Sequence, residues 1–265
     1  MCNTCGCNLT DGNRHLVDAG GDLHLTTHGS ESVEVLSGLL AANDRAAAHN
    51  RDHFDRHGVL AVNLMSSPGA GKTSLLEATI AAIGGHYRVA VIEGDLETEN
   101  DARRIRAAGV PAVQIITGSA CHLDAHLLHR ALHELDLDAI DVLFIENVGN
   151  LVCPAGFDLG QHLNVTLLST PEGDDKPAKY PVMFRAADLV LISKCDLLNA
   201  LGDFDVAAAT GHLRNLASGA PVIQVSVRDR RGLHEWLAWL QSARDGHDTH
   251  AVRAGSGSPA NAARA

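Results

Sequence analysis

The segment SSPGAGKTS, at residues 66–74, has the composition and spacing of a phosphate-binding loop. It follows the apolar run VLAVNLM and precedes the helical sequence LLEATIAAI, so it would join a buried strand to a helix. Backbone N–H groups and a helix N-terminus in such a loop bind phosphate oxygens. We expect Lys72 to reach the β- and γ-phosphates and Thr73 to ligate Mg²⁺. Ser66 replaces the first glycine of the motif, and the expected binding residues are Gly69, Ala70, Gly71, Lys72, Thr73 and Ser74.

A second segment, DLVLISKCDLL, could select the base of the nucleotide. Its SKCD tetrapeptide is similar to the N-K-x-D guanine motif, with Ser193 in place of asparagine. Asp196 would accept hydrogen bonds from both N1–H and the N2 amino group of guanine, which adenine cannot offer, and the stem of Lys194 would pack over the base. Ser226, at the end of a further strand, is expected in the loop that contacts guanine O6. The tetrapeptide alone could be an ordinary turn, but after a phosphate-binding loop it favours GTP over ATP.

Acidic residues end two of the apolar runs between these motifs. VAVIEGD ends with Glu93 and Asp95, and VLFIENVGN contains Glu146 and Gly149. A carboxylate at a strand end holds Mg²⁺ in many phosphoryl-transfer sites, so we expect Asp95 and Glu146 to act with Lys72 in hydrolysis. Gly149 could present its N–H to the γ-phosphate. The alternative for one of the acidic residues, Glu93 rather than Glu146, is to cap the following helix.

Cys121, His122 and Cys153 form a candidate metal site beside the nucleotide. Each follows an apolar run, and loops that follow parallel strands gather at one edge of the sheet. Two thiolates and an imidazole suit Zn²⁺ or Ni²⁺. Two unrelated cysteines are the simpler alternative, and a catalytic Cys–His pair is disfavoured because adjacent residues rarely face each other.

The N-terminal sequence MCNTCGC offers three more thiols, from Cys2, Cys5 and Cys7. With the N-terminal amine they could bind square-planar nickel or tetrahedral zinc. A redox pair would need a following helix to lower a thiol pKa, and none is predicted, so metal binding is favoured.

Three histidines, His49, His53 and His57, recur at helical spacing on one face of a predicted helix. Such a row can bind metal. We interpret it instead as a solvated or packing face, which is the more frequent case.

The elements that must position these residues follow from hydrophobic patterning. Apolar runs alternate with amphipathic segments from residue 59 onward, which predicts an α/β fold of the P-loop NTPase type with a mostly parallel sheet flanked by helices. The predicted strands are VLAVNLM, YRVAVIEG, AVQIIT, VLFIENV, NVTLLST, DLVLISK and PVIQVSV. The predicted organisation is a flexible metal-binding arm (1–35), a helix (36–57), a GTPase domain (58–243) and a disordered tail (244–265).

The composition of the chain argues against several classes of function and location. The chain has 265 residues, 45% of them apolar, and a formal net charge of −11. Such an acidic protein is not expected to bind nucleic acid or an anionic membrane through its overall field. Neither a signal peptide nor an apolar run of about 20 residues is present, so a cytoplasmic location, where thiols stay reduced, is expected.

Taken together, these motifs resemble those of the hydrogenase nickel-incorporation GTPases, the HypB family. The most specific stretches are MCNTCGC, TGSACHLDA and FIENVGNLVCPA. The resemblance implies a dimer-forming P-loop GTPase whose hydrolysis of GTP is coupled to delivery of Ni²⁺ to the hydrogenase large subunit, with the nickel chaperone HypA as partner. It also implies a high-affinity nickel site at the N-terminal cysteines, and a second nickel or zinc site, at a dimer interface, in the Cys121, His122 and Cys153 set.

Three other functions stay open at this point. One is a GTPase chaperone for another metalloenzyme, such as urease or a cobalamin enzyme. The second is a P-loop small-molecule kinase, which the SKCD motif disfavours. The third is a metal buffer with a vestigial P-loop, which the intact Lys72, Thr73 and Asp196 disfavour.

Overall fold

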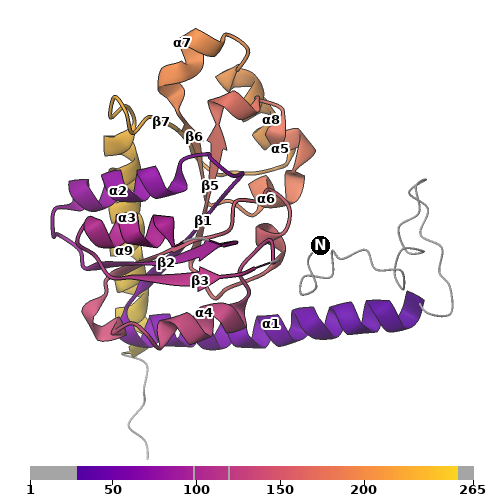
Figure 1. Ribbon diagram of the computed structural model, residues 1–265, viewed down its shortest axis with the longest axis vertical. Coiled ribbons are helices and arrows are strands. Elements are labelled where there is room, and N and C mark those ends of the chain that lie inside the picture. The colour runs from indigo at the N-terminus through magenta and orange to yellow at the C-terminus, as the bar shows by residue number, and fades with distance from the viewer. Residues whose placement is uncertain (1–28, 98, 119, 256–265) are drawn as a thin grey trace, which may run out of the picture.

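The computed structural model describes residues 29–97, 99–118 and 120–255, so Cys2, Cys5 and Cys7 lie outside the described residues. The described chain forms a parallel sheet of seven strands in the order β3-β2-β4-β1-β5-β6-β7 (Figure 1). The seven predicted runs and the parallel arrangement are therefore confirmed. The strands are β1 (Leu60–Ser66), β2 (Val89–Asp95), β3 (Ala112–Ile116), β4 (Val142–Glu146), β5 (Leu163–Ser169), β6 (Leu189–Ser193) and β7 (Val222–Val225).

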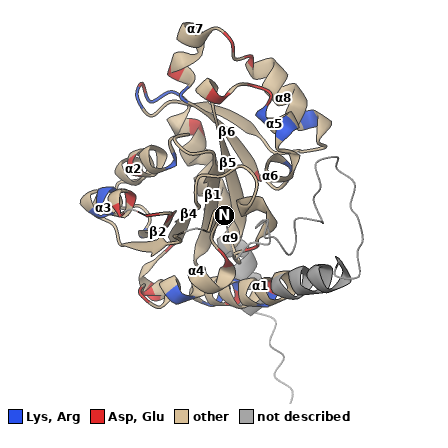
Figure 2. Ribbon diagram, turned by 45° about the vertical axis from the view of Figure 1, so that its right-hand side comes forward, with Lys and Arg blue, Asp and Glu red and all other residues tan. Residues whose placement is uncertain are grey.

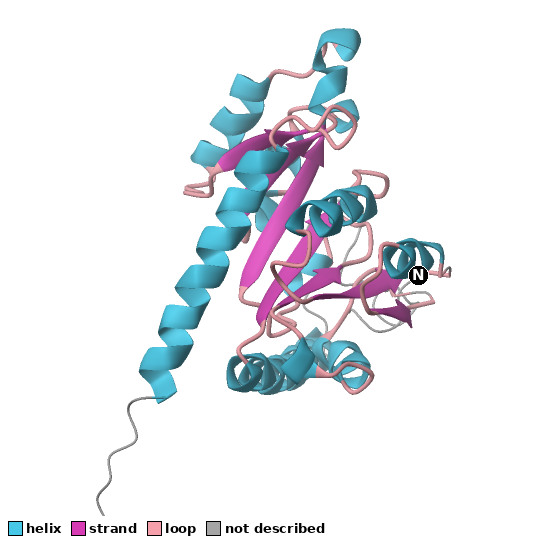
Figure 3. Cartoon of the chain, turned by 90° about the vertical axis from the view of Figure 1, so that its left-hand side faces the viewer, coloured by secondary structure: helices cyan, strands magenta, loops and turns pink. Residues whose placement is uncertain are grey.

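Helices cover both faces of this sheet (Figures 1 and 3), which explains why the central strands are apolar without alternation. One core packs the sheet against α2 (Lys72–Ile83), α3 (Asn100–Ala107) and α9 (Leu233–Gly255). On the opposite face, α1 (Gly29–His57) and α4 (Ala125–Leu132) cover the sheet near β2 and β4. Farther along that face lie α6 (Pro181–Arg185) and α8 (Val206–Asn215). Short elements complete the connections: η2 (Leu137–Ala139), η3 (Pro154–Gly156), η4 (Thr170–Glu172), α5 (Lys176–Lys179), η5 (Cys195–Leu197) and α7 (Leu198–Leu201).

The two terminal helices are longer than the sequence pattern predicts. Helix α1 begins at Gly29 rather than at residue 36. Helix α9 continues to Gly255, so the prediction of a disordered tail from residue 244 is wrong as far as that residue. The reason is tertiary packing, because Arg244 is buried and the His247 ring lies 4.3 Å from the ring of His162. The remainder of the predicted tail, 256–265, lies outside the described residues.

Parallel pairing brings the loops that follow the strands to one edge of the sheet. The phosphate-binding loop follows β1 there, and the segment with Cys121 and His122 follows β3. Among the described helices, none is both long and apolar enough to span a bilayer. The residues that carry the predicted chemistry at this edge are Lys72, Asp95, Cys121, Gly149, Cys153, Lys194 and Ser226.

Candidate nucleotide and metal site

A cavity of about 380 Å³ lies between the phosphate-binding loop and the ends of β2 and β4. Gly71 precedes α2 with a φ of 101°, a conformation that favours glycine, and it turns the start of the helix toward the cavity. Gly149 approaches from the loop after β4, where a Cβ would lie 2.8 Å from the Cα of Pro68. Only glycine lets these two loops meet so closely. The cavity is lined by the predicted residues Gly69, Gly71, Lys72, Thr73, Ser74, Asp95, Glu146 and Gly149.

Ser66, the departure from the usual motif, has a defined role in holding Lys72. The Lys72 ammonium is buried and donates a 3.0 Å hydrogen bond to Ser66 Oγ. The Ser66 hydroxyl in turn donates to the carbonyl oxygen of Ser67. The lysine is thus held at the floor of the cavity, 4.0 Å from Glu146 Oε1, where it can meet a phosphate.

Glu93 and Glu146 form a buried carboxyl pair that the sequence did not reveal. They are direct neighbours in register on β2 and β4, and both side chains are almost completely buried. Burial, followed by the Glu146 charge, raises the pKa of Glu93 from 4.5 to about 11. Glu93 therefore stays protonated and donates a hydrogen bond to the Glu146 carboxylate. Burial also raises the pKa of Glu146, while Lys72 acts in the opposite direction. Glu93 therefore does not cap a helix.

The donor atoms around Thr73 fit a magnesium ion. The Thr73 hydroxyl donates to Glu146 Oε1 at 2.9 Å. The second carboxylate oxygen, Glu146 Oε2, is buried, and among the described groups only the Glu93 carboxyl is placed to donate to Glu146 on that side. Asp95 lines the same cavity, although its Oδ1 accepts from the N–H of Leu96. Hydroxyl and carboxylate oxygens beside a phosphate pocket are the ligands that Mg²⁺ prefers.

A second cavity of about 340 Å³ adjoins the first across Gly71 and Ser74, and the SKCD residues line it. Lys194 adopts a left-handed conformation with φ 58°, and its Nζ donates to the carbonyl oxygen of Gly69 at 2.7 Å. Ser193 Oγ donates to the carbonyl oxygen of Ala70 at 2.7 Å. The serine thus fixes the phosphate-binding loop. Asp196 shares the cavity with apolar walls from Leu75, Leu167, Val225 and Val227, which suit a planar base.

Ser226 does not line this cavity. It is buried, and its hydroxyl accepts from the backbone N–H of Asp229 at 3.4 Å. Its flanking residues, Val225 and Val227, do line the cavity, so the predicted loop is in place.

Cys121, His122 and Cys153 come together, as their positions after β3 and β4 predict. Their ligand atoms lie within 4.8 Å of one another, with 2.9 Å between the two sulfur atoms and 3.8 Å between Cys121 Sγ and His122 Nδ1. The buried His122 ring stacks on Phe157 with centroids 3.9 Å apart. Burial lowers the pKa of His122, which favours the neutral, metal-binding imidazole. The set can hold one Ni²⁺ or Zn²⁺ ion.

Two asparagines connect the phosphate cavity to this metal cluster. Asn147 Oδ1 accepts from the N–H of Leu123, the residue after His122. Asn150 donates through its backbone N–H to Ser66 at 2.8 Å and through its side chain to the carbonyl oxygen of Cys121 at 3.3 Å. A movement of the loop after β4 would therefore be transmitted to the cysteines.

Arg104 is a further cavity residue that the sequence did not single out. It lines the phosphate cavity from α3 and forms ion pairs with Glu77 at 2.6 Å and Asp101 at 3.2 Å. Figure 2 shows basic and acidic residues together on this helix. Only the amphipathic pattern of residues 100–107 was a possible signal, and it does not distinguish a cavity residue from a surface one.

Comparison with known proteins places the chain in a family. The family model described as "CobW/HypB/UreG, nucleotide-binding domain" matches residues 60–224. A hydrogenase maturation factor HypB from Azotobacter chroococcum mcd 1 is 54% identical over 216 residues, covering 81% of this chain and 70% of that protein. The chain belongs to the HypB family of hydrogenase maturation factors. The resemblance in the sequence motifs is thereby confirmed.

Two further HypB proteins have names that mention a bound metal or a maturation role. A crystal structure of HypB from Helicobacter pylori in complex with nickel superposes with a TM-score of 0.74 and 41% identity, covering 77% of this chain and 96% of that one. A hydrogenase/urease maturation factor HypB from Helicobacter hepaticus is 44% identical, covering 81% of this chain and 89% of that protein. The HypB fold, with its nucleotide-binding domain, is therefore common to this chain and its relatives.

Proposed function

We propose that the chain is a GTP-hydrolysing nickel metallochaperone that inserts nickel into the large subunit of a [NiFe]-hydrogenase. The observation that carries the proposal is the link, through Asn147 and Asn150, between the phosphate cavity and the Cys121, His122 and Cys153 cluster. The nickel complex of the H. pylori relative supports nickel as the cargo. Family membership supports hydrogenase maturation over a small-molecule kinase or a simple metal buffer.

GTP would span the two adjoining cavities. Asp196 selects guanine, Lys72 leaves Ser66 to neutralise phosphate charge, and the Gly149 N–H contacts the γ-phosphate. Thr73, Asp95 and Glu146 would hold Mg²⁺, which supplies charge neutralisation at the phosphates. Glu146 is not a free general base, because it accepts a hydrogen bond from the protonated Glu93. Arg104 is held by Glu77 and Asp101 and is not free to stabilise the transition state, so intrinsic hydrolysis is slow.

Nucleotide state would then control the metal. When GTP orders the loop after β4, Asn150 shifts the Cys121 backbone and changes the geometry of the metal cluster. The ordered state forms a homodimer through this edge, and hydrolysis releases nickel to the recipient. Linkage requires that nickel alter GTP affinity by the same factor by which GTP alters nickel affinity.

The N-terminal cysteines Cys2, Cys5 and Cys7 would be the loading site that receives nickel from the chaperone HypA. Zinc is the competing ion at both sites, since the same thiolate and imidazole donors bind it.

Titration of Ni²⁺ and Zn²⁺ into the full chain, with GDP and with a non-hydrolysable GTP analogue, tests the proposal. Cys2→Ala/Cys5→Ala/Cys7→Ala should lose a tight nickel site and keep a weaker, nucleotide-sensitive one. Cys121→Ser/Cys153→Ser should lose the nucleotide-sensitive site alone. Equal nickel affinity with both nucleotides in the wild-type chain would refute the switch.

Urease maturation is the second candidate, because the H. hepaticus relative carries both names. Expression of the chain in a host lacking its own HypB, with hydrogenase and urease activity measured in the same cells, separates the two. Restored hydrogenase activity with no gain in urease activity supports the main proposal.

A further inference from the structure

Helix α1 packs against α4 (Figure 1). A cluster of histidine rings lies at this contact and uses none of the residues of the nucleotide and thiol sites. His49 and His53 are one turn apart on α1, and His129 lies on α4. The Nε2 atoms of His49 and His53 are 3.1 Å apart. The centroid of the His129 ring is 5.0 Å from that of His49 and 5.6 Å from that of His53. One ligand nitrogen from each ring lies within 4.8 Å of the other two.

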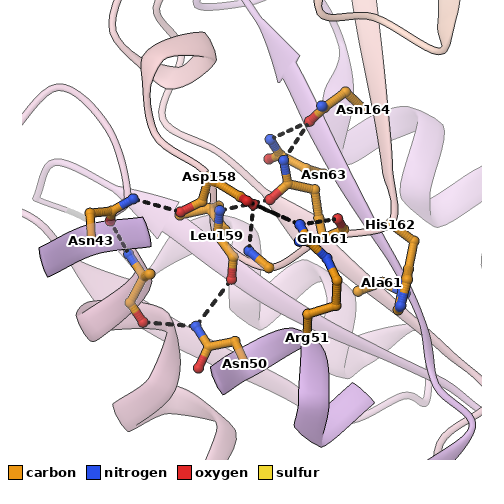
Figure 4. A network of polar contacts seen from close by, with 12 residues as sticks. Asn43, Asn50, Arg51, Ala61, Asn63, Asp158, Leu159, Gln161, His162 and Asn164 are labelled. Atoms are coloured by element: carbon orange, nitrogen blue, oxygen red, sulfur yellow. Dashed lines mark hydrogen bonds and ion pairs between the residues drawn. The ribbon is translucent and has the colours of Figure 1, made fainter. Parts of the chain in front are cut away.

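The orientation of His129 is fixed by a buried asparagine. Asn50 has no exposed surface, and its amide nitrogen donates to the carbonyl oxygens of Ala125 at 2.9 Å and Leu159 at 3.0 Å (Figure 4). The Asn50 amide oxygen must therefore be the atom 3.0 Å from His129 Nδ1, so that ring nitrogen is the donor. The proton on Nδ1 leaves Nε2 of His129 with a lone pair. Histidine ligands of metal sites are commonly held by their second nitrogen in this way.

The ring geometry agrees with coordination of one ion. Two nitrogens bound to zinc at a tetrahedral angle lie about 3.3 Å apart, close to the 3.1 Å between His49 and His53. Three imidazoles without a thiolate favour Ni²⁺, Cu²⁺ or Zn²⁺ over Mg²⁺ or Ca²⁺. His49 is exposed, so an ion can enter from solvent.

We propose that His49, His53 and His129 form an additional site for a divalent transition-metal ion, either Ni²⁺ or Zn²⁺. The pattern of α1 alone indicated a solvated or packing face, and the third ligand comes from α4. That helix begins directly after the segment with Cys121 and His122, and His129 is four residues into it, roughly 6 Å along its axis. The histidine site is thus adjacent in the chain to the thiol site.

The test uses the full chain without an affinity tag, with Cys2, Cys5 and Cys7 changed to Ala and Cys121 and Cys153 changed to Ser. In this background, NiCl₂ and ZnCl₂ are titrated without nucleotide, and bound metal is counted after equilibrium dialysis. Cu²⁺ serves as a spectroscopic probe, because nitrogen hyperfine structure in its EPR spectrum reports imidazole ligands. Comparing the two titrations assigns the site to nickel or to zinc.

We expect one metal equivalent in the background chain, and its loss, or a weakening of at least tenfold, in His49→Ala/His53→Ala and in His129→Ala. His234→Ala, an exposed histidine on α9, is the matched control and should keep the full equivalent. The circular dichroism spectrum and thermal unfolding of each metal-free variant exclude loss of fold as the cause. Equal binding in the background chain and the two cluster variants would overturn the proposal. So would a copper spectrum without the hyperfine pattern of several nitrogens. Because no nucleotide is present, failure here leaves the proposed GTPase function unaffected.

Discussion

At the residue scale, the protonated Glu93 predicts an unusual dependence of stability on pH. In the unfolded chain Glu93 ionises near its ordinary pKa, whereas in the fold its pKa is about 11. Folding therefore takes up a proton above about pH 4.5, and the contribution of Glu93 to stability falls as pH rises toward 11, by up to about 1.4 kcal/mol per pH unit. Glu93→Gln keeps a donor to Glu146 but removes this titration. The free energy of unfolding by urea should thus decline less between pH 5 and pH 9 in Glu93→Gln than in the wild-type chain.

Glu134→Gln, on the exposed end of the segment after α4, is the control for this comparison and should follow the wild-type pH profile. The same slope in Glu93→Gln and in the wild-type protein would mean that Glu93 is ionised in the fold.

The second prediction at the residue scale is that Asp196 determines the specificity of the protein for guanine nucleotides. A carboxylate can accept from both N1–H and the amino group of guanine, and each such charge-assisted bond contributes about 1.5–3 kcal/mol. Asp196→Asn should weaken GTP binding by about a hundredfold or more and favour xanthosine triphosphate, whose carbonyl replaces the amino group. Titrations with fluorescent nucleotides measure the affinities for GTP and for xanthosine triphosphate. Asp203 is exposed, so Asp203→Asn is the control. Unchanged GTP affinity in Asp196→Asn would place the base elsewhere.

At the scale of elements, the loop after β4 connects the nucleotide to the metal. Asn150 bonds to the phosphate-binding loop through its backbone and to the metal loop through its side chain. Asn150→Ala keeps the backbone bond to Ser66 and removes the two side-chain bonds, to the Cys121 carbonyl oxygen and from the Val152 N–H, so GTP binding should change little. The ratio of nickel affinities with GDP and with a GTP analogue, expected at about 5–150-fold in the wild-type chain, should fall toward one. Isothermal titration gives both quantities.

The exposed Asn215→Ala, at the end of α8, should leave this ratio unchanged. A ratio that persists in Asn150→Ala would show that the coupling runs through Asn147 or through the dimer instead.

The same elements show which parts of the fold and of the site could be predicted from the sequence. Strands and the phosphate-binding loop are local patterns, and all were predicted. Strand order is not local, so the Glu93 and Glu146 pair became visible only when β2 and β4 were found side by side in register. The histidine cluster was missed for a similar reason, because His129 approaches His49 from another helix. Helix α9 was predicted too short because its continuation depends on packing around Arg244.

At the scale of the whole molecule, three of the large exposed apolar side chains belong to the edge that carries the metal cluster. Leu96 is 42% exposed, Ile116 is 55% exposed and Val152 is 61% exposed. Val152 adjoins Cys153, and Leu96 and Ile116 follow or end β2 and β3, whose loops are joined by a hydrogen bond from the Gly118 N–H to the Leu96 carbonyl oxygen. Such side chains at one edge indicate an interaction surface, which fits a dimer that buries the metal cluster.

Val152→Asp is the corresponding prediction. A charge at this exposed position beside Cys153 must be desolvated on association, so the dimer formed with a GTP analogue and nickel should weaken at least tenfold. Sedimentation velocity over a range of protein concentrations measures the dissociation constant. Leu201→Asp is the matched control, since Leu201 is 42% exposed on α7, a helix that follows β6 and lies far from β3 (Figure 1). If both variants dimerise like the wild-type chain, the metal cluster acts within one subunit and the switch does not require a second copy. If only Leu201→Asp weakens the dimer, association occurs through the α7 end of the molecule, beyond β6, and not through the edge that carries the metal cluster.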